Sequence, residues 1–411
     1  EISACLVGSE MCIRDRRVMD YINRLNNYDM PDIANIAVGS ELYEEAFVIF
    51  KKAELHREAA KVLIDYVKSL ERASEFAERV DEPEVWVMLG KAKLAEGDVK
   101  EAIAALIRAE HADNYSEVIA ASDAAGTHAE LVTYLTMCRK KTKESHLDTS
   151  LIYAYAKSGQ HAELEEFISA PNVGRIQDVA ERCYSEAMYE AAKIMFNSIS
   201  NFARLATCLM HLGQHQAAVD AARKANSTRT WKEVNAACVK HGEFRLGQIC
   251  ALHIIVNPDE LEELISHYEQ YGFFEEVITV MEAGLGLERA HMGIFTELGI
   301  LYSKYKEEKL MEHIKLYWSR VNIRKMLKAC EESAQWEEVV FLHLHHDDFD
   351  NAAAMMIAHP TEAWDNSKFK DTVQKLANTD LFYQAIDFYL AQQPLLLNAV
   401  SYTHLRAHET G

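Results

Sequence analysis

The sequence predicts an all-α protein, an α-solenoid of stacked helical hairpins, from three observations. The 411 residues include only 16 glycines and 6 prolines, so residues that interrupt helices are scarce. A short motif recurs at intervals that are mostly near 30 residues or twice that length, which is the length of two helices and two turns. Between its copies the apolar residues keep helical spacing, as at Leu261, Leu264, Ile265 and Tyr268.

Each copy of the motif has a turn residue, one bulky residue and a helix start rich in Glu and Ala. We expect a helix to begin at or beside each bulky residue, and in chain order these are Tyr43, Val99, His128, His161, Tyr189, His215, Phe244, Phe274, Trp336, Phe349 and Phe382. The interval of 13 residues between Trp336 and Phe349 predicts one hairpin in which both helices carry the motif.

Glycine and proline residues lie at positions in this pattern where helices are expected to end or begin. Gly126 and Gly159 fall in the expected turns, where a left-handed residue ends a helix at little cost. Pro83 and Pro258 fall at expected helix boundaries. Because one hairpin cannot bury its apolar face alone, we expect the hairpins to stack into a rod with one continuous core.

The repeat pattern assigns residues 17–398 to the solenoid and leaves two ends outside it. Residues 1–16 (EISACLVGSEMCIRDR) and 401–411 (SYTHLRAHETG) show no helix-packing pattern. Both resemble translated adapter sequence, so we expect them to be non-native ends and exclude them from the fold.

Charge and cysteine content narrow the possible functions. The formal net charge is −21, which disfavours binding to nucleic acid or to an anionic membrane surface through the overall field. No apolar run approaches the length of about 20 residues that spans a bilayer, so we expect no direct membrane insertion. The eight cysteines include no C-x-x-C pair. Five of them lie in apolar helical contexts, as expected for buried, reduced thiols of a cytoplasmic protein: Cys138, Cys183, Cys208, Cys238 and Cys250.

The segment FLHLHHDDFD (residues 341–350) raises the possibility of a metal site. In a continuous helix His343, His346 and Asp347 would share one face, and their side chains would suit zinc. The repeat pattern instead places a turn here, with Asp348 in the loop and Phe349 starting the next helix. We therefore expect a polar helix end, with no metal and no cofactor.

No catalytic signature is present in the chain. A P-loop, G-x-S-x-G, H-E-x-x-H, and a G-x-G-x-x-G that follows a strand are all missing. We expect no enzymatic activity. One alternative to a structural protein is a tetratricopeptide-like adaptor that binds peptides in a groove, although that repeat has a stricter period near 34 residues.

Six segments resemble the clathrin heavy-chain family: YINRLNNYDMPDIANIA, ARKANSTRTWKEV, LGLERAHMGIFTELGILYSKYK, WSRVNI, HPTEAW and FKDTVQKLAN. The likeness runs from about Arg17 to about Asn398 and corresponds to the distal part of the knee and the proximal leg. The family's N-terminal propeller and C-terminal trimerisation segment are not among the segments that match, so we expect both to lie outside these residues.

The resemblance implies a structural, self-assembling leg segment of the clathrin coat, at the cytoplasmic face of coated pits and coated vesicles in endocytosis and intracellular trafficking. It implies two kinds of partner: other clathrin heavy chains, in the triskelion and the cage, and the clathrin light chain on the proximal leg.

Local charge suggests where the light chain binds. Residues 304–328 carry eight basic and three acidic side chains, which gives +5 in a chain of −21. Tyr317 and Trp318 could supply an apolar anchor within this stretch. The expected light-chain-binding residues are Lys304, Lys306, Lys309, Lys315, Tyr317, Trp318, Arg320, Arg324, Lys325 and Lys328. A second basic tract, Arg139 to Lys143, is smaller, and we expect it to be a solvated surface.

Overall fold

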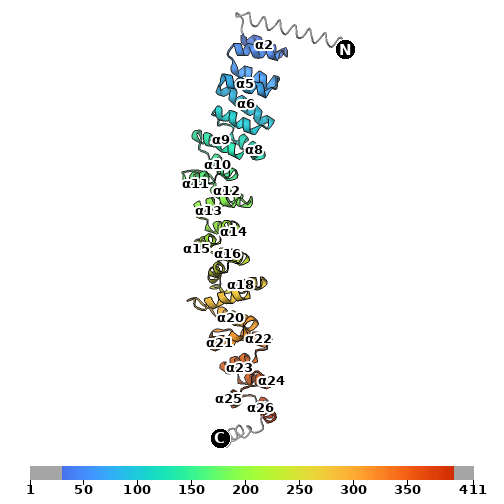
Figure 1. Ribbon diagram of the computed structural model, residues 1–411, viewed down its shortest axis with the longest axis vertical. Coiled ribbons are helices and arrows are strands. Elements are labelled where there is room, and N and C mark those ends of the chain that lie inside the picture. The colour runs from blue at the N-terminus through green and yellow to red at the C-terminus, as the bar shows by residue number, and fades with distance from the viewer. Residues whose placement is uncertain (1–29, 393–411) are drawn as a thin grey trace, which may run out of the picture. The chain divides into compact units, whose positions relative to one another are not determined.

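The computed structural model describes residues 30–392. Over this range the chain forms 25 α-helices and no β-strand, and the prediction of an all-α solenoid of helical hairpins is confirmed. The chain forms two compact units, divided between Leu212 and Gly213. Within each unit the helices follow one another in chain order (Figure 1). The two expected non-native ends, residues 1–16 and 401–411, lie outside the described residues.

In the first unit the helices are α2 (Met30–Gly39), α3 (Tyr43–Lys52), α4 (His56–Lys61), the π-helical turn η1 (Val62–Tyr66), α5 (Leu70–Val80), α6 (Pro83–Glu96), α7 (Val99–Arg108), α8 (Tyr115–Ala125), α9 (His128–Lys141), α10 (Ser145–Ser158), α11 (His161–Ser169), α12 (Ile176–Ser185), α13 (Tyr189–Ser198) and α14 (Phe202–His211).

In the second unit they are α15 (His215–Ala225), α16 (Thr228–Lys240), α17 (Phe244–Ile254), α18 (Pro258–Gln270), α19 (Phe274–Gly284), α20 (Met292–Tyr305), α21 (Glu307–Tyr317), the 3₁₀ turn η2 (Trp318–Arg320), α22 (Ile323–Glu332), α23 (Trp336–His345), α24 (Phe349–Ala358), α25 (Asn366–Val373) and α26 (Thr379–Gln392).

The predicted helix starts agree closely with the observed ones. Ten of the eleven bulky residues are the first residue of a helix, including the pair Trp336 and Phe349 on consecutive helices α23 and α24. The exception is Phe382, which lies three residues inside α26. Asn378 explains the earlier start, because its side-chain oxygen accepts the backbone N–H of Asp380 at 3.0 Å and so caps the first turn.

The turns use left-handed residues where the sequence predicts them. Gly126 and Gly159 both have φ of 73°, and each follows the last residue of a helix. Pro83 and Pro258 are the first residues of α6 and α18, where a missing N–H costs no helical hydrogen bond.

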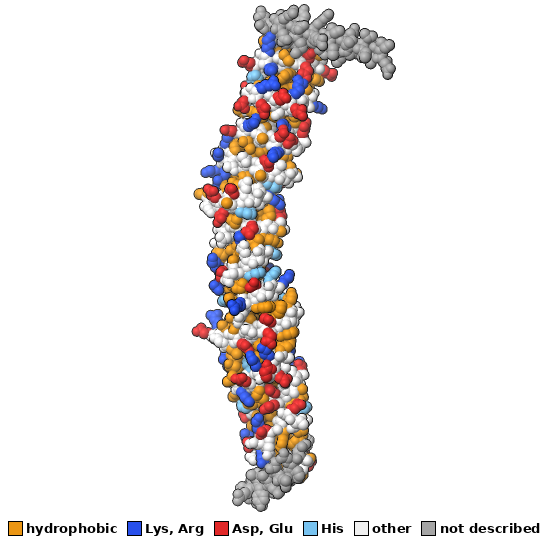
Figure 2. All heavy atoms as spheres, viewed as in Figure 1, with side chains coloured by type: hydrophobic (Ala, Val, Ile, Leu, Met, Phe, Trp, Pro, Cys, Tyr) orange, Lys and Arg blue, Asp and Glu red, His pale blue; other side chains and the backbone are white. Residues whose placement is uncertain are grey.

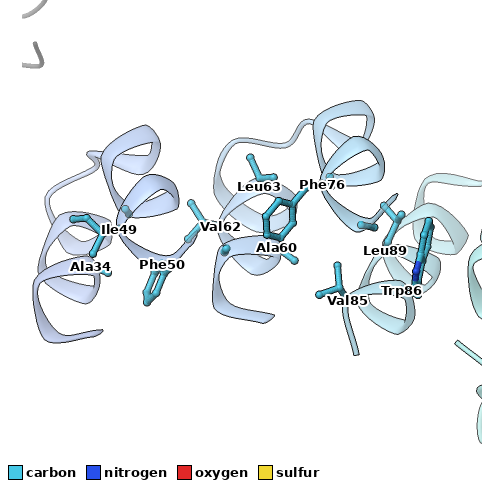
Figure 3. Packing of buried hydrophobic residues seen from close by; sticks show 14 of the residues in the cluster. Ala34, Ile49, Phe50, Ala60, Val62, Leu63, Phe76, Val85, Trp86 and Leu89 are labelled. Atoms are coloured by element: carbon cyan, nitrogen blue, oxygen red, sulfur yellow. The ribbon is translucent and has the colours of Figure 1, made fainter. Parts of the chain in front are cut away.

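The core of each unit is built from the inward faces of its hairpins. At the start of the first unit, Ile49, Phe50, Leu63 and Phe76 point into the space between helices α2 to α6 (Figure 3). A core at the end of the second unit is centred on Phe369 and includes Val340 and Tyr389. The five cysteines expected to be buried are all buried free thiols. Burial raises the pKa of Cys183 to about 12, which makes that thiol a poor nucleophile at neutral pH.

Alternate helices of the second unit form two layers. In one layer α18 contacts α20 and α20 contacts α22, whereas in the other α17 contacts α19 and α21 contacts α23. Ion pairs also join α16 to α18. On the face shown in Figure 2, acidic and basic side chains are interspersed along both units. Among the described residues, none of the helices combines the length and the apolarity needed to cross a membrane.

Candidate partner-binding surface

Nine of the ten predicted binding residues lie on four consecutive elements of the second unit, and the tenth lies between two of these elements. Lys304 is in the last turn of α20, and Lys306 lies between α20 and α21. Three more are on α21, two are in η2, and three are on α22. The sequence stretch is therefore folded back on itself, and its charges face different neighbours.

Three of the lysines are paired with carboxylates of the preceding hairpin. Lys304 Nζ lies 3.4 Å from Glu269 Oε1 of α18, and Lys309 Nζ lies 2.8 Å from Glu282 Oε1 of α19. Lys306 pairs with Glu275 of α19. The hydrogen bond to Glu282 raises the pKa of Lys309. The local charge of +5 counted along the sequence is therefore reduced in space by acidic residues that are distant in sequence.

Lys325 is held by two carboxylates at once. Its Nζ lies 2.9 Å from Glu262 Oε1 of α18 and 3.1 Å from Glu297 Oε1 of α20. Bonding to Glu262, and then to Glu297, raises the pKa of Lys325. This lysine therefore links three helices of one layer, and an acidic partner that approached it would meet two carboxylates.

The predicted aromatic anchors are partly used by the fold itself. The Tyr317 ring lies 5.0 Å from the ring of Phe295, and the Arg320 guanidinium lies 3.9 Å above that same ring. The Trp318 ring packs against His345 at 5.5 Å and His346 at 5.6 Å. These contacts attach η2 to α20 and to the end of α23.

The structure exposes an apolar side chain that the sequence analysis missed. Leu316, on α21, is 65% exposed beside Lys315. A helical wheel could have found it, because Leu310 and Ile314 define the buried face of α21 and Leu316 lies about 200° from Ile314.

The ten residues do not form a single surface. Lys309, Lys315 and Leu316 lie on α21, in the layer that includes α23. Arg324, Lys325 and Lys328 lie on α22, in the layer that includes α18 and α20. A helical partner that lies on one layer would contact one of these groups rather than both.

The FLHLHHDDFD segment contains the predicted turn. α23 ends at His345, and Asp347 has φ of 58°, so His343, His346 and Asp347 do not share a helical face. His343 Nδ1 lies 3.0 Å from Asp348 Oδ2, and Asp348 also caps α24 by accepting the backbone N–H of Asn351. Across residues 30–392, His, Cys, Asp and Glu side chains nowhere gather in threes that could hold a metal ion.

The prediction of a solvated second basic tract is wrong for Arg139. Its Nε donates to Asp148 Oδ1 at 2.8 Å, and the Asp148 side chain is only 2% exposed. Arg139 also donates to the carbonyl of Pro171, while Asp148 accepts the N–H of Val173. The pair fastens the loop between α11 and α12, a role that the sequence spacing did not reveal because the loop lies more than 20 residues away. Lys140 and Lys143 are exposed, as expected.

Stacked hairpins, helix starts at a repeated motif and the division into two layers define a helical-repeat protein. The chain belongs to the family described as "Clathrin: Region in Clathrin and VPS", which matches residues 10–101, 106–246 and 252–397. The resemblance to clathrin heavy chains is thus confirmed, and the match favours this repeat over the tetratricopeptide alternative.

Several curated relatives are similar over almost the whole chain. It is 57% identical over 382 residues to the clathrin heavy chain of Drosophila melanogaster, covering 93% of this chain and 23% of that protein. It is 54% identical over 398 residues to that of Dictyostelium discoideum, covering 97% and 24%. It is 53% identical over 382 residues to clathrin heavy chain 2 of Homo sapiens, covering 93% and 23%. The chain spans about a quarter of the length of these relatives.

Proposed function

We propose that this chain is a structural leg segment of a clathrin coat, at the cytoplasmic face of coated pits and coated vesicles. The observation that supports this most is the family match, which extends over three segments between residues 10 and 397. The fold suits such a role, because a stack of hairpins offers long surfaces to which other proteins can bind. The role is structural rather than enzymatic.

The partners in this proposal are other clathrin heavy chains and a clathrin light chain. For the light chain we favour α21 over α22. The α21 surface combines the exposed Leu316 with Lys315 and with Lys309, which is paired with one carboxylate, Glu282. On α22, Lys325 is shared by two carboxylates. Burial of an apolar side chain contributes more binding free energy than a single exposed ion pair, which is worth about 0.2 to 1 kcal/mol.

Binding of a recombinant light chain to the immobilised protein tests this assignment. Lys309→Glu combined with Lys315→Glu is expected to weaken binding at least tenfold, and Leu316→Ser to weaken it without changing charge. The control Lys140→Glu with Lys141→Glu, on α9 in the first unit, is expected to have less than a threefold effect. Circular dichroism melts verify that each variant stays folded, since Lys309→Glu also breaks the pair with Glu282.

A second comparison separates the two layers. Lys325→Glu with Lys328→Glu changes the charge on α22 by the same amount as the α21 variant. An equal loss of binding in both double variants would contradict the α21 assignment, and no loss in either would show that none of these four lysines contributes to the light-chain site.

A further inference from the structure

Two hollows flank helix α18 in the second unit. One, of about 280 Å³, lies on the side of α16 and is lined by Lys232, Glu260, Glu263 and Leu264 among others. The other, of about 360 Å³, lies on the side of α20 and α22, and its lining includes Leu261, Glu262, Met292, Glu297 and Lys325. Figure 1 shows α16, α18, α20 and α22 in succession along the unit. Neither hollow is part of the α21 surface described above.

The two hollows share one electrostatic arrangement. In the first, Lys232 Nζ lies 2.7 Å from Glu260 Oε2 and 2.5 Å from Glu263 Oε2. In the second, Lys325 is shared in the same way by Glu262 and Glu297. Each hollow thus holds one lysine and two carboxylates, which leaves an excess of one negative charge on either side of α18.

The carboxylates that carry this excess are accessible to a partner. Side chains of Glu262 and Glu263 are 74% and 67% exposed, whereas Glu297 is almost buried. The hydrogen bond from Lys325 lowers the pKa of Glu262, so this carboxylate is charged at neutral pH. Each carboxylate has acceptor capacity beyond the single lysine contact, since an ionised carboxylate accepts about four hydrogen bonds.

An apolar contact point lies beside the second hollow. Met292 is the first residue of α20 and is 53% exposed, although its neighbour Ile294 is fully buried. A flexible thioether side chain adapts to the shape of a partner. Pro258 and Leu261 of α18 add apolar lining next to it.

From this arrangement we propose that the surface formed by α16, α18, α20 and α22 binds a basic amphipathic helix that crosses α18. Charge complementarity selects the partner: two cationic side chains meet Glu263 and Glu262 on either side of α18, and a large apolar side chain meets Met292. Glu262 and Glu263 are adjacent residues about 100° apart around α18, and their side chains diverge toward Lys325 of α22 and Lys232 of α16. On a helix about 10 to 12 Å across, cations that meet the outer sides of these carboxylates lie about 10 Å apart. Residues i and i+7 of a helix have this spacing, because seven residues rise about 10.5 Å. The partner is chemically distinct from an acidic helix bound at α21, and the inference does not depend on the light-chain proposal.

Titration of the intact protein with fluorescent model helices tests the proposal. The probe peptide carries lysines at i and i+7 on one face with leucines between them, and its matched control has the same composition with the lysines on the opposite faces of the helix. Anisotropy at physiological salt is expected to show at least tenfold tighter binding of the probe than of the control peptide. Equal binding of the two peptides, or no binding of either, would overturn the proposal.

Two variants locate the site. Glu262→Lys with Glu263→Lys changes the net charge of each hollow from −1 to +1, and is expected to weaken probe binding at least tenfold. The control Glu308→Lys with Glu312→Lys makes the same change in net charge on α21 and is expected to change binding less than threefold. Met292→Gln, which leaves the charge unchanged, is expected to weaken binding at least threefold. If the α21 control weakens binding as much as the α18 variant, the peptide is responding to overall charge and the proposed site is wrong.

Discussion

His128 illustrates how a single side chain links the repeat motif to stability. It is the first residue of α9, where other hairpins have Tyr or Phe, and its ring packs edge-on against Tyr153 at 6.1 Å. Its Nδ1 is buried with no hydrogen-bond partner among the described residues. Burial lowers the pKa of His128; Asp123 offsets part of this effect, while Lys157 and Arg182 lower the pKa further.

The protein is therefore expected to lose stability in mild acid, and His128→Phe should reduce this loss. The unfolded chain takes up a proton on this residue below the ordinary histidine pKa of about 6.5, whereas the folded chain resists it. The contribution of His128 is then complete above that pH and declines as the pH falls through it. Melting temperatures of the wild type and of His128→Phe, compared between about pH 7.5 and pH 5 where histidine titrates, measure the difference. Parallel pH profiles would contradict this role.

For the histidines of the FLHLHHDDFD segment we predict that adding or removing metal does not change the stability of the protein. His343 and Asp348 are bonded to each other, and Asp348 also caps α24, so neither side chain is available as a metal ligand without breaking the turn. We expect a chelator to leave the melting temperature unchanged, and equimolar zinc not to raise it. A reproducible rise with zinc would show a native-state metal site, because a ligand that binds only the folded protein must stabilise it.

Within a helical hairpin, the backbone conformation of the turn residue is expected to affect stability more than the space around that residue. Gly159 follows α10 with φ of 73°, and a Cβ there would meet no atom within 4 Å. Gly159→Ala should still cost about 1 kcal/mol of unfolding free energy, because the left-handed conformation is unfavourable for a residue with a Cβ. Gly39 is the matched control: it also has open space, but its φ is not positive. Chemical denaturation should show less than about 0.5 kcal/mol for Gly39→Ala; equal costs would contradict the conformational argument.

Much of the hairpin pattern could be predicted from the sequence, because helix starts and turns depend on neighbouring residues. The bulky residue at ten helix starts, the left-handed glycines and the turn at Asp348 are all of this local kind. Contacts between hairpins could not be predicted in the same way. The pairs Lys309–Glu282, Lys325–Glu262 and Arg139–Asp148 depend on which helix faces meet, and the spacing of charges along the chain does not specify that.

The candidate partner surface shows the same limit. The count of basic residues between Lys304 and Lys328 treated two helical layers as one surface. Leu316 was missed because it interrupts no pattern in the sequence, and Trp318 was expected at the surface although its ring packs on two histidines. The exposure of side chains and the layer in which each helix lies distinguish α21 from α22 as a candidate partner surface, whereas the composition of the sequence does not.

For the whole molecule, each hairpin contacts mainly its neighbours, so the stability of each unit is approximately a sum of hairpin and interface contributions. Exposed ion pairs between hairpins contribute little individually. The buried apolar faces therefore carry most of the stability, and surface charges are free to vary with the partner. This division suits the structural role proposed above, in which one repeated scaffold would contact different proteins along its length.

Assembly of a chimeric heavy chain tests the coat role most directly. In this chimera, residues 17–398 replace the matching segment of the Drosophila melanogaster clathrin heavy chain. Electron microscopy under assembly conditions is expected to show closed cages at a yield close to that of the unmodified heavy chain. A chimera that is folded and trimeric, yet forms no closed cages, would contradict the conclusion that this chain is a structural segment of a clathrin coat.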